Sequence, residues 1–167
     1  MVKVKNGAEH LEEVRRLFRE YSCIEGAERC FISFENELKE LPGVYAEPAG
    51  AIRLAFMGGK AVGCAAFKPV DKSTCEIKRL FVLEEYRSNG IGEVLIKDIL
   101  NLAFKKYEIV QLETLPFMTS AIRIYERNGF LKVGIEDGVI LMKKIRNLKK
   151  EETGEENDCR KMFSMWR

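Results

Sequence analysis

The sequence predicts an α/β fold with a mixed, mostly antiparallel central sheet and flanking helices. Two patterns support this class. Strand-like runs follow one another across short turn signals at Gly58-Gly59 and residues 71–73, which is typical of antiparallel neighbours. Farther along, an amphipathic run of helical length separates two apolar runs, and a strand–helix–strand connection makes its two strands parallel. The strand-like runs are 51–56, 60–70, 74–82 and 109–113, and the connecting helix is 91–107.

The N-terminal part predicts a short strand over residues 2–5 and then two helices. The first helix, residues 9–21, carries one apolar stripe at helical spacing. The second, residues 30–41, turns three apolar residues inward and ends at Pro42-Gly43. The first stripe consists of Leu11, Val14, Leu17, Phe18 and Tyr21, and the second of Phe31, Phe34 and Leu38.

The C-terminal part predicts one more helix and a hairpin. Residues 118–128 form the helix, and Gly129 follows it in the position where a left-handed residue commonly closes a helix. Residues 130–133 and 139–143 then form two strands across a turn at Asp137-Gly138.

The composition is that of an ordinary globular chain of one domain. The 167 residues are 46% hydrophobic and 32% charged, as in most single-domain proteins. The net charge of +2 is too small to indicate a nucleic-acid or membrane partner. No apolar run is long enough to span a membrane, and the first residues do not resemble a signal peptide. We therefore expect a cytoplasmic protein.

Cysteine and histidine usage argues against a metal site and against a hydrolase. The five cysteines are odd in number and form no C-x-x-C pair, so we expect free thiols and no bound metal. The single histidine, His10, lies among charged residues. A Ser-His-Asp or Cys-His hydrolase would therefore lack a credible base.

The chain divides into a domain, residues 1–146, and a charged tail, residues 147–167. Residues 149–158 are charged and poor in apolar side chains, which is typical of a solvated linker. The large apolar residues that follow either dock on the domain or on a second subunit, as in a homodimer, or belong to a disordered end. They are Met162, Phe163, Met165 and Trp166.

The loop of residues 87–92, Arg-Ser-Asn-Gly-Ile-Gly, is the clearest functional signal. It lies between a predicted buried strand and a predicted helix. The first N–H groups of a helix have no internal partner and attract anions. Gly90 and Gly92 allow close approach of a ligand to the main chain, and Arg87 supplies a charge that pairs with phosphate. A tight turn with no ligand is the alternative. The spacing fits neither a Walker A motif nor a dinucleotide fingerprint.

Three motifs in order resemble the GCN5-related N-acetyltransferase (GNAT) superfamily. The first is residues 76–82, Glu-Ile-Lys-Arg-Leu-Phe-Val. The second is residues 86–92, which include the glycine loop. The third is residues 121–130, Ala-Ile-Arg-Ile-Tyr-Glu-Arg-Asn-Gly-Phe. The resemblance is strong from Glu76 to Phe130 and weaker from about Glu9 to Lys144.

The resemblance implies that acetyl-CoA is the donor and that no metal is needed. Its pyrophosphate would lie on the main chain of the glycine loop, at Arg87, Ser88, Asn89, Gly90, Ile91 and Gly92. Its pantetheine arm would run beside Leu80, Phe81 and Val82. In this superfamily the two parallel strands splay apart, and here the slot would open between residues 81–82 and 112–113. Many members contact the cofactor through an Asn before the last helix; this chain has Thr119 and Ser120 instead, which we expect to cap the helix, with Ser120 as the substitute contact.

Two residues are the candidates for catalysis. Glu76 is the candidate base that removes a proton from an amine acceptor, directly or through water; its alternative is a surface carboxylate paired with Lys78 or Lys72. Tyr125 matches the tyrosine that protonates the CoA thiolate in many members; its alternative is a core aromatic. Glu113, at the rim of the slot, either binds the acceptor ammonium or is an alternative base. Residues that we expect to line the acceptor side are Phe31, Phe34, Glu35 and Tyr45.

The sequence thus predicts an acetyl-CoA-dependent N-acetyltransferase. We expect direct transfer of the acetyl group to a primary amine of a small molecule or protein in a ternary complex. The alternative is a non-catalytic acyl-CoA-binding module of the same fold.

Overall fold

The structure, a computed structural model, describes residues 1–147 of the chain. The predicted tail, with its four large apolar residues and Cys159, therefore lies almost wholly outside the described residues. Within these, the strands form one seven-stranded sheet in the order β1-β2-β3-β4-β5-β7-β6. The strands are β1 (Lys3–Asn6), β2 (Ala51–Met57), β3 (Lys60–Pro69), β4 (Thr74–Val82), β5 (Ile109–Thr114), β6 (Leu131–Glu136) and β7 (Val139–Ile145).

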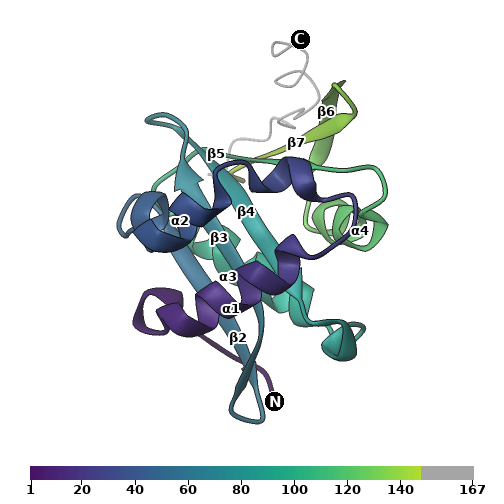
Figure 1. Ribbon diagram of the computed structural model, residues 1–167. Coiled ribbons are helices and arrows are strands. Elements are labelled where there is room, and N and C mark those ends of the chain that lie inside the picture. Colours follow the sequence, from purple (N-terminus) through teal and green to yellow (C-terminus); the bar gives the residue numbers. More distant parts are fainter. Residues whose placement is uncertain (148–167) are drawn as a thin grey trace.

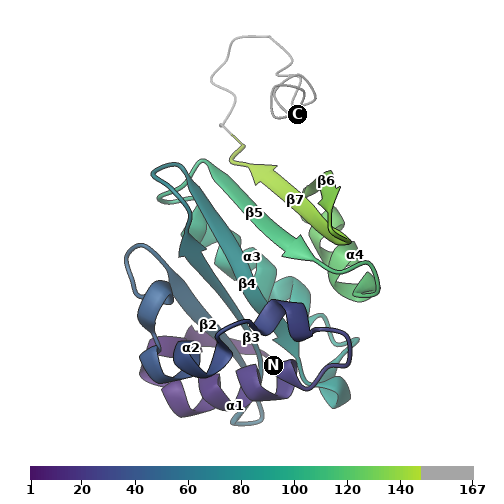
Figure 2. The ribbon, with the colours of Figure 1, turned by 45° about the horizontal axis from the view of Figure 1, so that its top comes forward.

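Helices cover both faces of this sheet. Helices α1 (Leu11–Ser22) and α2 (Phe34–Glu40) lie on one face, and α3 (Ile91–Ala103) lies on the other, beside α4 (Thr119–Arg127) (Figures 1 and 2). The predicted fold class is confirmed: β4 and β5 pair in parallel, and the other neighbouring strands pair antiparallel. None of the helices within residues 1–147 is long and apolar enough to cross a membrane.

The core forms where the predicted apolar stripes meet the sheet. From α1, Val14, Leu17 and Phe18 are fully buried, and α3 contributes a wider buried face. The predicted free thiols Cys64 and Cys75 are buried in β3 and β4 and form no disulfide. Buried apolar area of this kind supplies most of the stability of such a domain.

The second predicted helix is broken in the structure. A single turn of 3₁₀-helix, η2 (Glu28–Phe31), precedes α2 (Phe34–Glu40). Ser33 between them has φ 59°, in the left-handed region that interrupts a right-handed helix. The predicted stripe therefore belongs to two short elements, so the chain can turn sharply over the sheet.

The helix predicted over residues 91–107 is shorter than expected. It ends at Ala103, and Phe104 is its C-cap. Tyr107 leaves the helical path because its ring is buried and its hydroxyl donates to the carbonyl of Ala49 at 2.6 Å. A tertiary hydrogen bond has here overridden local helical periodicity.

Strands β4 and β5 separate halfway along their length. Their parallel pairing runs from Thr74 opposite Ile109 to Ile77 opposite Leu112 and goes no further, although β4 continues to Val82. Figure 2 shows the two strands diverging toward their C-terminal ends. The edge of β4 beyond Ile77 thus has no strand partner on the β5 side, as the resemblance implied.

A β-bulge in β4 begins immediately after the last parallel pair. Lys78 pairs with Ala66 and Phe81 with Cys64, so Arg79 and Leu80 both stand opposite one residue of β3. Arg79 has φ 62°, a left-handed conformation that is uncommon for arginine. A bulge bends the strand that carries it, and this one bends β4 where it leaves β5.

The side chain of Arg79 ties this bulge to η2 and α2. Its Nε donates to Glu37 Oε1 at 3.1 Å, its Nη2 donates to Glu37 Oε2, and its Nη1 donates to the carbonyl of Cys30 at 2.7 Å. The guanidinium also lies 4.4 Å from the ring centre of Phe31. Tyr45 donates its hydroxyl proton to the same Glu37 carboxylate. The bulge and the turn over the sheet therefore form one unit.

We predict that Arg79→Met destabilises the protein by about 3–5 kcal/mol, because a buried carboxylate is left without its partner. The Arg79 and Glu37 side chains are only 5% and 15% exposed. Urea unfolding measures the loss, and the double variant Arg79→Met/Glu37→Met should recover much of it. Breaking the exposed pair of Arg19 with Glu35, whose side chains are 57% and 66% exposed, should cost less than about 1 kcal/mol. Equal losses for the two pairs would contradict the prediction.

Candidate active site

A large cavity of about 530 Å³ opens beside the C-terminal half of β4, where it leads into α3. Its size is typical of a small-molecule site. All the residues predicted to bind the cofactor line it except Asn89. They are Leu80, Phe81, Val82, Arg87, Ser88, Gly90, Ile91, Gly92 and Ser120.

The glycine loop presents main-chain donors to this cavity. Gly90 is the N-cap of α3 with φ 74°, a conformation that favours glycine. The first intrahelical bond runs from the amide of Val94 to the carbonyl of Gly90 at 3.1 Å, so the preceding amides of the first turn have no partner within the helix. Asn89 lies outside the lining, and its side chain donates to the carbonyls of Tyr86 and Arg87. Asn89 therefore shapes the loop rather than facing the cavity.

Gly92 has a second, structural reason to be glycine. A Cβ at this position would lie 2.7 Å from Cδ1 of Ile124 in α4, closer than packed carbon atoms allow. Gly92 thus lets α3 and α4 approach, in addition to lining the cavity.

Arginines surround the large cavity on two sides. Arg87 comes from the loop, and Arg123 and Arg127 come from α4. Arg87 Nε donates to the carbonyl of Val82 at 2.9 Å, and Arg127 pairs with Glu93 in the first turn of α3. Positive charge at a helix N-terminus is suited to phosphate. The two α4 arginines were not predicted, although their spacing of four residues places them on one helix face.

The predicted cap of α4 is wrong. The N-cap is Met118, which makes no side-chain hydrogen bond to the helix. Thr119 and Ser120 lie inside the first turn instead, because the helix begins at Thr119, whereas a Thr119 cap would place its start at residue 120 and a Ser120 cap at residue 121. Ser120 still lines the large cavity.

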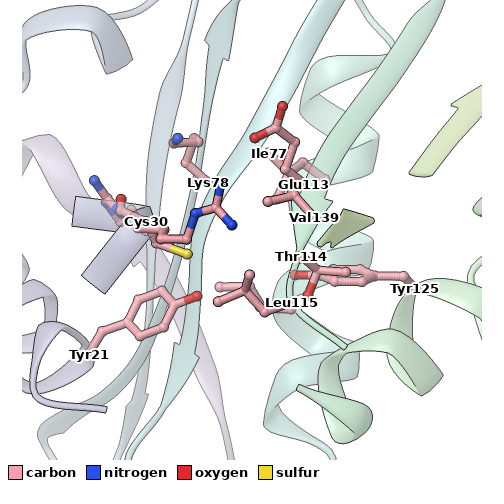
Figure 3. Close-up of a pocket in the computed structure, with 12 residues that line it drawn as sticks. Tyr21, Cys30, Ile77, Lys78, Glu113, Thr114, Leu115, Tyr125 and Val139 are labelled. Atoms are coloured by element: carbon pink, nitrogen blue, oxygen red, sulfur yellow. The ribbon is translucent and has the colours of Figure 1, made fainter. Parts of the chain in front are cut away.

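A small cavity of about 80 Å³ lies between the splayed strands and beneath η2 (Figure 3). Tyr21 and Leu80 line both cavities, so the two meet at these residues. The small cavity is lined by Tyr21, Arg29, Cys30, Ile77, Lys78, Arg79, Leu80, Glu113, Thr114, Leu115, Tyr125 and Val139.

Two tyrosines approach the junction of the cavities from opposite sides. Tyr125 points inward from α4 and Tyr21 from α1 (Figure 3). Burial raises the pKa of Tyr125 well above its ordinary value, and the nearby Tyr21 and Cys30 raise it further. Burial also raises the pKa of Tyr21 to about 12. Both hydroxyls are therefore protonated at neutral pH and able to donate a proton. Tyr21 was not predicted as a site residue.

The two candidate bases occupy different places. Glu76 lines neither cavity; its carboxylate accepts a hydrogen bond from Gln111 at 3.3 Å and lies 3.6 Å from the ammonium of Lys78. Glu113 lines the small cavity and points into it, across from Lys78 (Figure 3). Of the two candidate bases, only Glu113 therefore lines the small cavity.

The residues expected to line the acceptor side lie outside both cavities. Phe31, Phe34, Glu35 and Tyr45 line neither cavity. Phe31 packs against Tyr21 and Phe34, and Tyr45 is buried. The break at Ser33 turns the neighbouring Arg29 and Cys30 toward the cavity instead. Among residues 1–147, no group of His, Cys, Asp and Glu side chains could hold a metal ion.

Comparison with known proteins assigns this architecture to one family. The model of the acetyltransferase (GNAT) family matches residues 11–130. A Schizosaccharomyces pombe protein, named as an uncharacterised N-acetyltransferase, is 32% identical over 123 residues, which cover 72% of this chain and 76% of that protein. The chain belongs to the acetyltransferase (GNAT) family, and its named relatives support an acyltransferase.

Solved structures of acetyltransferases share this fold. An acetyltransferase from Streptococcus agalactiae has a TM-score of 0.72 at 20% identity, covering 87% of this chain and 98% of that one. A GNAT family acetyltransferase from Elizabethkingia anophelis was solved with acetyl-CoA bound. It has a TM-score of 0.54 at 27% identity, covering 65% of this chain and 83% of that one.

We predict that Gly90→Val weakens acetyl-CoA binding about tenfold or more, the effect of losing one charge-assisted hydrogen bond. The branched side chain disfavours φ 74° and shields the loop amides. Calorimetric titration measures the affinity. Gly59→Val is the matched control: its φ is 82° and, like Gly90, it has no atom within 4 Å of an added Cβ, but it lies in the β2–β3 turn. Equal affinity in a folded Gly90→Val variant would refute the loop assignment.

Proposed function

We propose that this protein is an acetyl-CoA-dependent N-acetyltransferase that acts on a primary amine of a small molecule or protein by direct transfer in a ternary complex. One observation carries the proposal: two cavities of different character meet at Tyr21 and Leu80, beside the buried hydroxyl of Tyr125. The large cavity suits a phosphate-bearing donor and the small one an acceptor. The acetyl-CoA bound to the Elizabethkingia relative supports this choice of donor.

The donor would be held by the residues that line the large cavity. The amides at the start of α3, with Arg87, would bind the pyrophosphate. The edge of β4 from Leu80 to Val82 would pair with the pantetheine amides, because β5 has moved away from it. Bringing thioester and amine together at the junction removes much of the entropic barrier to the reaction.

Different residues of the slot would carry out the proton transfers. The acceptor ammonium must lose a proton before its nitrogen attacks the thioester carbon. Glu113 is the base in reach, and Glu76 would need water to relay the proton. As the carbon–sulfur bond breaks, Tyr125 donates its proton to the sulfur and CoA leaves as the thiol. The raised pKa of Tyr125 keeps that proton in place until then. The second proton of the nitrogen, which is lost as the amide forms, returns to the tyrosinate.

We predict that Tyr125→Phe lowers kcat by about 10²–10⁴-fold, the range for loss of a general acid. The affinity for acetyl-CoA should change little, because the ring and its packing against Phe130 remain. Tyr107→Phe is the control, since its hydroxyl bonds to Ala49 away from both cavities. Steady-state release of CoA thiol measures the rates. Full activity of the Tyr125→Phe variant would remove the hydroxyl from the mechanism, and binding without any turnover in the native protein would support the non-catalytic module.

We predict that Glu113→Gln lowers kcat/KM at neutral pH by about a hundredfold or more and that the deficit shrinks as pH rises. The reason is that a larger fraction of the acceptor amine is then already deprotonated. The matched variant Glu76→Gln removes a carboxylate from the adjacent strand and should have a smaller effect. The pH–rate profiles of both variants decide between them: the reverse order would assign the base to Glu76, acting through water.

A further inference from the structure

The small cavity is lined by charges of both signs, and they are not balanced. Three cations line it, Arg29, Lys78 and Arg79, against one anion, Glu113. Glu113 comes from β5 and Lys78 from β4, and Figure 3 shows them on opposite walls at the end of the cavity away from the two tyrosine hydroxyls. Whatever occupies the cavity meets these charges.

The protein neutralises these cations to different extents. The charge of Arg79 is matched by Glu37. Lys78 lies 3.6 Å from Glu76 Oε1, a loose pair that leaves N–H donors of the ammonium unused. Arg29 donates to the carbonyl of Asp137, which is a neutral group, and within residues 1–147 neither Arg29 nor Glu113 forms a salt bridge. The excess positive charge therefore lies at Arg29 and Lys78.

The charged groups that line the small cavity all act on its interior. The thiol of Cys30, which lines the cavity, is influenced by all of them: burial raises its pKa most, Lys78, Arg79 and Arg29 lower it, and Glu113 raises it. Arg79 is buried and Lys78 is half-buried, whereas Arg29 and Glu113 are exposed, so the charges of Arg79 and Lys78 are the less screened ones. A ligand that carries one positive and one negative charge would pair with Glu113 on one wall and with the cations on the other.

We propose that the acceptor, in the activity proposed above, is a small amine that carries its own carboxylate. Its ammonium faces Glu113, and its carboxylate faces Lys78 and Arg29. A plain amine would leave Arg29 without a counter-ion and Lys78 with only its loose pair to Glu76, and a diamine would bring a second positive charge toward them. A free amino acid has both required charges.

The experiment measures acetyl-CoA-dependent release of CoA thiol with matched acceptors. Glycine, β-alanine, L-aspartate and L-glutamate are each compared with an amide analogue in which one carboxylate has become neutral. At least one acid should have a kcat/KM about tenfold or more above that of its amide, the effect of one ionic hydrogen bond. The four acids differ in the distance between their ammonium and carboxylate groups, so their rates show which distance the cavity accommodates.

Variants test whether Lys78 and Arg29 bind the carboxylate of the acceptor or only support the structure of the cavity. Lys78→Gln and Arg29→Gln should each raise KM for the preferred acid about tenfold while leaving KM for its amide unchanged. Lys78→Glu should reverse the preference. Lys72→Gln, an exposed lysine in the β3–β4 turn that lines neither cavity, is the control. A change of equal size for acid and amide would show that Lys78 only holds Glu76 in place.

Three results would overturn the inference: amides used as well as acids, an acid preference unchanged in both variants, or no turnover of any acid although acetyl-CoA binds. Failure of acetyl-CoA itself to bind would be a different result, because it would overturn the proposed function. Titration of the donor alone therefore precedes the acceptor panel and keeps the two failures distinct.

Discussion

The ion pair of Arg79 with Glu37 is the interaction on which the geometry of the whole site depends. Parallel pairing ends at Ile77 and Leu112, and the bulge at Arg79 begins two residues later on the same strand. A left-handed arginine in a strand costs free energy, and it is retained here because its side chain finds a carboxylate, a carbonyl and aromatic rings. The same contacts hold η2 over the slot. One buried interaction thus opens the sheet and supplies one wall of the cavity that the opening creates.

The two cavities differ in their electrostatics for a physical reason. The large cavity is bounded by helix amides and arginines and opens toward solvent, so it suits a polyanion that is partly hydrated. At the junction the side chains are tyrosines, leucine and a thiol, and burial raises the pKa of both hydroxyls. Low polarity at this point keeps both hydroxyls protonated at neutral pH. Charged side chains line the small cavity, where Arg29, Lys78 and Arg79 stand against Glu113.

Features that depend on neighbours in the sequence were predicted well. The turns at Gly58-Gly59 and Asp137-Gly138, the closing Gly129 and the loop from Arg87 to Gly92 are encoded within a few residues of chain, where turn and helix-end chemistry is decisive. The structure has φ values of 87° at Gly129 and 74° at Gly90. The sequence indicated most of the half of the large cavity's lining that β4, the glycine loop and α3 carry; the other half comes from the end of α1 with the segment after it, residues 117–118 and α4, of which it indicated only Ser120.

Features that depend on distant partners were not predictable. Arg79 reaches Glu37 across 42 positions and the carbonyl of Cys30 across 49, so nothing local indicates that a strand arginine adopts φ 62°. The break at Ser33 follows from the same contacts, and it moves the predicted aromatic lining away while it brings Arg29 and Cys30 in. Tyr21 belongs to an ordinary apolar stripe, and its place at the junction depends on the path of β4 beneath it.

The position of Cys30 bears on how an acetyl group would cross the junction. A thiol between donor and acceptor suggests a covalent relay, in which sulfur first takes the acetyl group and then passes it on. That route requires a thiolate, and burial raises the pKa of Cys30 despite three nearby cations. The neutral thiol is a poor nucleophile, whereas an amine deprotonated beside Glu113 needs no intermediate carrier. Tyr21 and Leu80 line both cavities, an arrangement that would let both substrates be present at once in the proposed reaction. Direct transfer is therefore the route that this arrangement of weak acids and charges favours.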